Sequence, residues 1–188
     1  LTLGVSFLLP VGRSHIGTDI RAGIRLMASD RRWIGFLLIV FTRALGGAFI
    51  LHFLFIYLAD IGAGGTVRGI ALAVATVSEL FVFFFAHAVL ERFGPRKTIL
   101  FALGATAVRL LLFSLISSPF LALAVQLMYG LTVSLFLVAA VNYAKELAPP
   151  SMGATAQAVL TSVNLGAGGM VGALVGGFLY ERIGVKPM

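Results

Sequence analysis

Three charged residues, Arg43, Glu79 and Arg109, lie near the middle of long stretches of mostly apolar sequence. Each stretch has roughly twenty or more residues, which is the length of helix that crosses a bilayer. An ion at mid-depth in a membrane costs on the order of 3 kcal/mol or more unless it faces a protein interior or an aqueous cavity. Charges in such positions commonly line a path for a solute or a proton. The three residues therefore predict transport chemistry.

Glu79 is the candidate for carrying a proton. A carboxylate beside an arginine stays ionised, whereas one that faces only apolar wall takes up a proton near neutral pH. In this hypothesis Arg109 or Arg43 modulates the proton affinity of Glu79, and the alternative is a static buried ion pair that fixes helix packing. One glutamate with two arginines leaves a surplus positive charge, which awaits an acidic residue from elsewhere or an anionic substrate such as an aromatic carboxylate.

Neutral polar residues in the same stretches are further candidates. Asn164 and Thr132 are central, and they either bind a substrate or join helix to helix through hydrogen bonds. Gln126 and Tyr129 are predicted to line the cavity. Near the ends of their stretches, where water is close, are His52, His87 and Tyr57. We interpret the histidines as interfacial, with a proton relay as the alternative, and the tyrosine as part of an aromatic belt.

Five apolar spans must position these side chains, which makes the predicted fold an all-α, polytopic transmembrane helical bundle. The spans are about 33–59, 69–90, 98–116, 120–144 and 154–180. The connectors between them are brief and rich in glycine and proline, so consecutive spans are expected to be antiparallel.

The composition agrees with a membrane protein. Of the 188 residues, 60% are hydrophobic and 11% are charged, and the mean hydropathy is +1.05. Such a chain has too little polar surface to cover a globule in water. The net charge of +7 does not indicate nucleic-acid binding, because the basic residues lie mainly between the spans. Cysteine is absent, no enzyme motif is found, and we expect no metal or cofactor site.

Basic residues also predict the orientation. They are concentrated in alternate connectors, namely residues 11–32, residues 91–97 and the connector with Lys145, and these are expected to be cytoplasmic. Residues 1–10 form an apolar stub that ends at a proline, which we interpret as the end of a preceding transmembrane helix in an internal fragment.

The segment 11–32 is predicted to be a cytoplasmic linker. Within it Ile20, Ile24 and Met27 recur at helical spacing, which indicates an amphipathic helix on the inner membrane surface. A disordered basic loop is the alternative.

Two glycine patterns have both structural and dynamic interpretations. Gly168, Gly172 and Gly176 repeat every four residues, which predicts close packing of a neighbouring helix and, in a transporter, sliding or bending. A second pattern is the turn that contains Glu91, Arg92, Gly94, Arg96 and Lys97. It is either a simple tight turn or a charged latch that engages helix ends in one conformation.

This turn, Glu-Arg-Phe-Gly-Pro-Arg-Lys over residues 91–97, resembles the one that the major facilitator superfamily places between helices 2 and 3 and between helices 8 and 9. A long linker before it and two spans after it match the second half of such a protein. The resemblance implies a carboxyl-terminal bundle over residues 33–184, made of helices 7 to 11 with helix 12 missing. It also implies an N-terminal six-helix half as partner.

Other pieces are similar to the branch of proton-linked sugar, nucleoside and phenylpropionate symporters that includes lactose permease. They are Phe84-Phe85-Ala86, then Arg92, Gly94 and Lys97, then Val108-Arg109, and the tail from Met152 to Gly184. The resemblance covers roughly residues 70–184. It implies that Arg109 belongs to the proton-coupling region.

Departures from that branch limit what the resemblance implies. Where lactose permease has a basic residue, a histidine and a glutamate in helix 10, this chain has Gln126, Tyr129 and Thr132. Glu79 also lies about one helical turn from the family's sugar-binding carboxylate. Neither lactose specificity nor that coupling mechanism is expected here.

The expected function is secondary active transport of a small organic solute, such as a sugar, nucleoside or aromatic acid, by alternating access. Proton symport across a bacterial inner membrane is predicted, with the solute, protons and the bilayer as partners. The alternative is a membrane scaffold or binding component that does not transport. In that protein the charges would be structural and the glycine pattern would serve partner helices.

Overall fold

The structure is a computed structural model that describes residues 20–183, including the side chains of residues 23–182 apart from Phe49 and Leu51. The stub over residues 1–10 lies outside the described residues. The described part confirms the all-α prediction. Its elements are α2 (Ile20–Ser29), α3 (Arg31–Asp60), α4 (Gly65–Leu115), α5 (Pro119–Gln126), η2 (Gly130–Ser134), α6 (Leu135–Leu147), α7 (Gly153–Thr161), η3 (Ser162–Gly168) and α8 (Gly169–Ile183), where η2 and η3 are π-helical.

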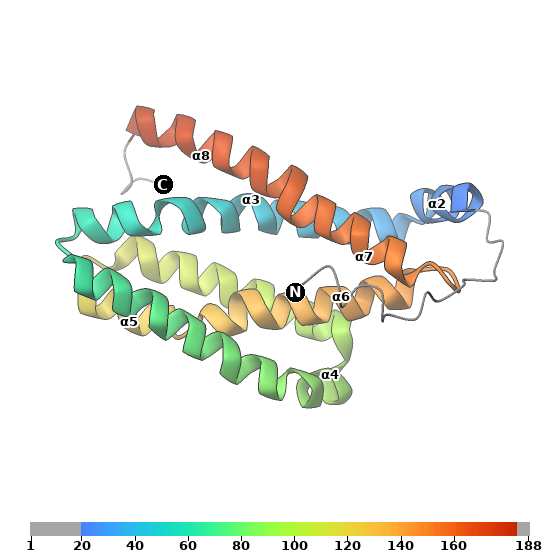
Figure 1. Ribbon diagram of the computed structural model, residues 1–188, viewed down its shortest axis with the longest axis horizontal. Helices are drawn as coiled ribbons and strands as arrows, with labels where there is room; N and C mark the ends of the chain where they lie inside the picture. The colour runs from blue at the N-terminus through green and yellow to red at the C-terminus, as the bar shows by residue number, and fades with distance from the viewer. Residues whose placement is uncertain (1–19, 184–188) are drawn as a thin grey trace, which may run out of the picture.

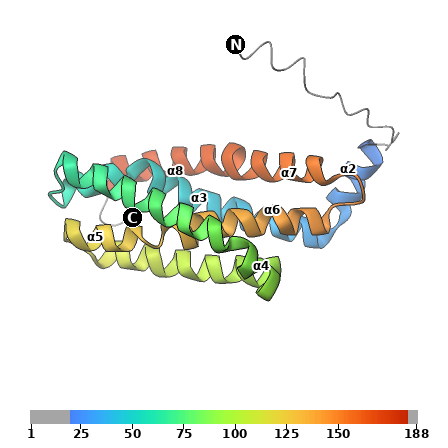
Figure 2. The same cartoon turned by 60° about the horizontal axis from the view of Figure 1, so that its bottom comes forward.

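Four of these helical segments are long and apolar enough to cross a membrane. They are residues 31–60, 65–115, 119–147 and 153–182. The second has 51 residues, and a straight helix of that length would extend about 76 Å, more than twice the ~30 Å apolar thickness of a bilayer. It is interrupted at Gly94, whose φ of 76° and ψ of 158° are not helical. There the chain reverses direction (Figure 2), so α4 supplies two antiparallel limbs that include the second and third predicted spans.

The helices pack in two groups. The two limbs of α4 pack against α5, η2 and α6, while α3 packs against η3 and α8. Contacts of α6 with α7 and with α3 join the groups. Figure 1 shows α7 and α8 crossing α3 on the side opposite the first limb of α4.

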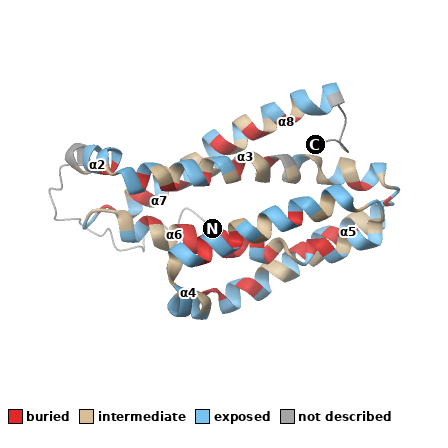
Figure 3. Cartoon of the chain, turned by 180° about the vertical axis from the view of Figure 1, so that it is seen from behind, coloured by how far each residue is buried: buried red, intermediate tan, exposed pale blue. Residues whose placement is uncertain are grey.

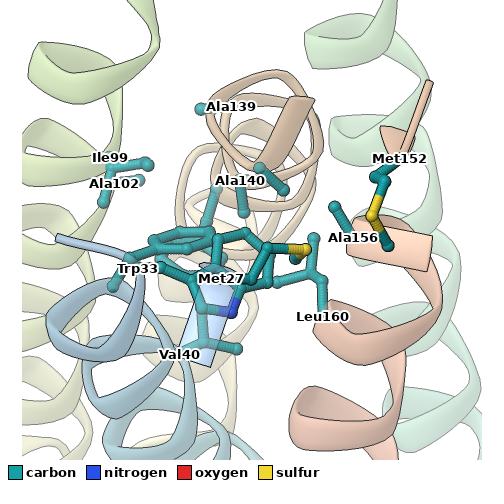
Figure 4. Packing of buried hydrophobic residues seen from close by; sticks show 13 residues of the cluster. Met27, Trp33, Val40, Ile99, Ala102, Ala139, Ala140, Met152, Ala156 and Leu160 are labelled. Carbon is teal, nitrogen blue, oxygen red and sulfur yellow. The ribbon is translucent and has the colours of Figure 1, made fainter. Parts of the chain in front are cut away.

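Two separate apolar clusters stabilise the ends of the bundle. The first surrounds Trp33, Phe36 and Phe136, and Figure 4 shows its side chains arriving from α2, α3, the second limb of α4, α6 and α7. The second cluster surrounds Leu58 and Ala122 at the other end. Along α3, both limbs of α4 and the segment 119–147, the intramembrane polar residues lie between the members of these two clusters. The bundle is therefore apolar at both ends of its interior and polar between them.

The outer surface of the described bundle is strongly apolar. Large side chains such as Phe84 and Leu115 are 81% and 79% exposed, and Figure 3 shows exposed residues along the outer sides of all the long helices. Water-soluble monomers rarely expose apolar surface on this scale. The chain is an integral, multi-pass membrane protein, and lipid is the medium that covers these side chains.

Helix α2 docks onto the bundle. Met27 is 4% exposed and packs in the first apolar cluster with Trp33. A side chain added at Gly23 would collide with the sulfur of Met152, so α2 also lies against the connector before α7. Residues 20–29 of the predicted linker are thus helical, while residues 11–19 lie outside the described residues. Met27 packs into the bundle, which differs from the predicted place on the membrane surface, although Ile24 remains 49% exposed.

Candidate functional site

Arg109 lies inside the bundle, on the second limb of α4. Its side chain is 2% exposed. Nη2 donates to Oε1 of Gln126 at 2.6 Å and Nη1 donates to Oγ1 of Thr132 at 3.1 Å. The guanidinium carbon also lies 5.2 Å from the centre of the Tyr129 ring and 5.4 Å from that of Phe113. The charge is held by neutral acceptors and aromatic faces, and the side chain does not point at lipid.

Arg43 approaches the same place from α3. It is half-buried, and its guanidinium carbon lies 4.4 Å from the centre of the Phe136 ring. Nη1 donates to Oδ1 of Asn164 at 3.5 Å and Nη2 donates to the backbone oxygen of Thr132 at 3.3 Å. Thr132 therefore joins the two arginines, one through its hydroxyl and the other through its carbonyl.

Both neutral residues that meet Arg43 belong to π-helical segments. Thr132 lies in η2 and Asn164 lies in η3. A π-helical turn leaves backbone groups outside the regular hydrogen-bond pattern, and such turns are frequent at functional sites. Here the irregular backbone supplies an acceptor to the half-buried Arg43. The local departures from the α-helix and the charged residues thus occur at the same depth.

Glu79 lies on the first limb of α4 and does not pair with either arginine. Its Oε1 accepts a hydrogen bond from Oγ of Ser134 at 3.1 Å. Among the described residues, the one acid and base pair within 4.0 Å is His87 with Glu91, at 3.2 Å on the surface. The buried ion pair considered as an alternative is not formed.

Tyr129 lies among all three charges. It is close enough to Glu79 to interact with it electrostatically, and it interacts in the same way with both arginines. The two arginines also interact with one another. The structure thus gathers seven of the candidates that the sequence indicated into one neighbourhood. These are Arg43, Glu79, Arg109, Gln126, Tyr129, Thr132 and Asn164.

Two serines that were not predicted from the sequence, Ser78 and Ser134, complete the site. Ser134 holds Glu79, and Ser78 spans the irregular start of η2 by donating to the oxygen of Leu127 at 2.5 Å and accepting from the nitrogen of Gly130 at 3.1 Å. Ser78 and Glu79 therefore hold the two ends of η2. Serine is common in membrane helices, so these two were hard to identify from the sequence. Ser78 lies beside Glu79, and Ser134 lies two positions after Thr132.

The turn at Gly94 is tight and lacks a latch in this structure. Glu91 faces His87, and Arg92 lies over the ring of Phe93 at 5.5 Å. Within the described chain neither Arg96 nor Lys97 forms an ion pair, and both are exposed. The oxygen of Gly94 accepts a hydrogen bond from Thr98 at 2.8 Å, which closes the first turn of the second limb.

The remaining candidates lie away from the charged site. His52 and His87 are exposed. Tyr57 turns inward and its hydroxyl donates to the oxygens of Phe113 at 2.9 Å and Ile116 at 2.5 Å. It thus satisfies backbone groups at the end of α4, which differs from the predicted place in an aromatic belt, because the terminal carbonyls of a helix need donors.

The glycine repeat packs against α3. A Cβ at Gly168 would lie 2.5 Å from Cβ of Ala44, and one at Gly172 would lie 2.7 Å from the oxygen of Leu45. Gly176 is also buried. The predicted close approach of helices is therefore made within the chain itself.

Comparison with known proteins establishes the family. A family model described as "MFS_1 like family" matches residues 13–188. The chain belongs to the MFS_1 like family. The resemblance to the major facilitator superfamily is thereby confirmed at superfamily level, while the lactose permease branch stays a prediction. No solved structure matches the chain.

Several curated relatives agree with this membership. Major facilitator superfamily domain-containing protein 6-like protein A of Xenopus laevis is 27% identical over 185 residues, which are 96% of this chain and 30% of the relative. The uncharacterized transporter YwbF of Bacillus subtilis is 24% identical over 167 residues, 89% of the chain and 42% of the relative. The maltose permease of Geobacillus stearothermophilus is 32% identical over 148 residues, which are 78% of this chain and 38% of the relative. This member of the MFS_1 like family thus spans less than half the length of each of these relatives.

Proposed function

We propose that this chain is part of a secondary active transporter that moves a small organic solute across a membrane by alternating access. The observation that carries the proposal is the gathering of Arg43, Arg109 and Glu79 between two apolar clusters, at the two π-helical segments. Ionised groups at this depth are costly and are typical of solute or proton paths. Family membership and relatives named transporter and permease support it.

The proposed arrangement is the second half of a two-half transporter. In it α3 is helix 7, the limbs of α4 are helices 8 and 9, and the fourth and fifth spans are helices 10 and 11. A six-helix half of the full-length protein would face the charged site, and solute would bind between the halves. The greater length of the relatives supports such a partner. The solute class proposed is a sugar, nucleoside or aromatic acid, and one relative is named for maltose.

Glu79 is proposed to carry the coupling proton, in a membrane with a proton gradient such as the bacterial inner membrane. Its partner Ser134 suits this role, because a hydroxyl donates to a carboxylate and accepts from a carboxylic acid. Glu79 can therefore keep one hydrogen bond in both protonation states. Arg109 or Arg43 is proposed to modulate its proton affinity, because a positive charge nearby favours the ionised carboxylate.

Replacing Glu79 by glutamine tests both transport and coupling. Full-length protein in proteoliposomes is expected to accumulate solute faster with an inward proton gradient, and Glu79→Gln is expected to remove that stimulation. Glu91→Gln, at the exposed turn, is the matched control and should leave the stimulation unchanged. A gradient effect that survives in Glu79→Gln would assign the proton to another group.

The scaffold alternative is less well supported by the packing. It needs a glycine face that is free for partner helices, but Gly168 and Gly172 already contact α3. Absence of solute uptake by folded full-length protein, with and without the gradient, would favour the scaffold.

A further inference from the structure

The two arginines form a concentrated positive charge that the described residues do not neutralise. Every hydrogen-bond acceptor of Arg43 and Arg109 is neutral, being an amide, a hydroxyl or a backbone oxygen. The Nε atoms of both side chains are buried and make no hydrogen bond within the described chain. Like charges in a poorly solvated place repel, and buried charges are normally paired. Among the described residues neither arginine forms an ion pair, so an anion from outside them would find both charges unpaired.

The two side chains differ in access. Arg109 is 2% exposed and is held by Gln126 and Thr132, so it acts as a fixed charge behind the site. Arg43 is half-buried, and its bonds to Asn164 and Thr132 are long, at 3.5 and 3.3 Å. A charged oxygen ligand would form a shorter and stronger bond than these. Arg43 is thus the residue that can exchange weak neutral partners for an anion.

We propose that the transported solute is a small organic monoanion whose carboxylate binds Arg43 in the field of Arg109. This inference rests on the proposed transport function and narrows its solute class. With Glu79 ionised, the two arginines leave one net positive charge, and with Glu79 protonated they leave two, so the site attracts a carboxylate in either state. Phe136, packed on Arg43, keeps water from one face of the guanidinium and strengthens the attraction.

The same geometry links the anion to the proton. Protonation of Glu79 removes the negative charge that opposes an anion, so the proton and the anion favour each other's binding. Glu79 accepts a hydrogen bond from Ser134, and Tyr129, just before η2, is close enough to interact with it electrostatically.

Matched pairs of solutes test the proposal on the full-length protein. Glucuronate is compared with glucose, and benzoate with benzamide, by the shift of the unfolding temperature in detergent and by uptake into proteoliposomes. We expect at least one anion to bind about tenfold or more tightly than its neutral counterpart, from charge-assisted bonding. Arg43→Gln should remove this preference and Arg43→Lys should retain part of it. Arg68→Gln is the control, because Arg68 also has a buried unpaired Nε but lies at the start of α4, away from the site.

Each outcome separates this inference from transport itself. Uptake of neutral solutes without a preference for anions would contradict the proposal of a monoanionic solute and would still agree with transport. Binding of an anion that depends on Arg43, without uptake of any solute, would support the anion site and contradict transport. No shift with either pair, or an anion preference that survives Arg43→Gln, would overturn the anion site.

Discussion

Arg109→Gln is expected to lower solute uptake by about 100-fold. The substitution removes a charge that is 2% exposed, together with the bonds to Gln126 and Thr132. Truncating one partner of a buried, hydrogen-bonded charge costs about 2–5 kcal/mol, and about 2.8 kcal/mol corresponds to a factor of 100. Thr132, whose backbone oxygen accepts from Arg43, would also lose the bond from Arg109 to its hydroxyl. Initial uptake rates in proteoliposomes, divided by the amount of folded protein, measure the effect.

A second variant separates charge from geometry. Arg109→Lys keeps the positive charge but cannot direct two donors in the fixed fork of a guanidinium. We expect uptake between that of the wild type and that of Arg109→Gln, with Arg68→Gln near the wild type. If Arg109→Gln folds normally and takes up solute at the wild-type rate, the cluster has no part in transport.

Gly172→Ala is expected to lower the unfolding temperature in detergent by on the order of 5 °C or more. Its Cβ would lie 2.7 Å from the oxygen of Leu45 and 2.9 Å from Cβ of Ala48, so α3 and α8 would have to separate. Backbone atoms cannot yield as the end of a flexible side chain can. Because η3 carries Asn164 beside Arg43, uptake is expected to fall as well.

Gly177→Ala is the matched control on the same helix. A Cβ at Gly177 meets nothing within 4 Å, and alanine is a better helix former than glycine. The unfolding temperature of this variant should be unchanged or slightly higher. Equal destabilisation by both substitutions would show that the effect comes from helix propensity, not from contact with α3.

Much of the fold follows from the lengths of the apolar runs. Backbone groups within lipid must be satisfied inside each segment, so a long apolar run has little choice but to form a helix. Gly94 could be identified as a turn because glycine tolerates the positive φ found there. The docking of α2 was harder to predict. The spacing of Met27 indicated an amphipathic helix on the membrane surface, whereas Met27 packs with Trp33 in the first apolar cluster.

The residues of the charged site could be predicted, but the contacts that they make with one another could not. Mid-span position identified Arg43, Glu79 and Arg109, because charge at that depth is unusual. Which residues the charged side chains contact depends on η2 and η3, because a π-helical turn rotates the residues after it relative to a regular α-helix. Sequence spacing based on 3.6 residues per turn therefore cannot show that Glu79 meets Ser134 instead of an arginine.

The charged side chains are proposed to face an aqueous chamber that they share with the solute. The chain has no cysteine, so single substitutions to cysteine report access of a membrane-impermeant thiol reagent in a cysteine-free full-length protein. Asn164→Cys, beside Arg43, is compared with Leu111→Cys, on the second limb of α4, where the side chain is 63% exposed on the apolar surface. We predict that Asn164→Cys reacts, that solute protects it, and that Leu111→Cys stays unreactive in the bilayer. An unreactive Asn164→Cys, or one that solute does not protect, would contradict the account.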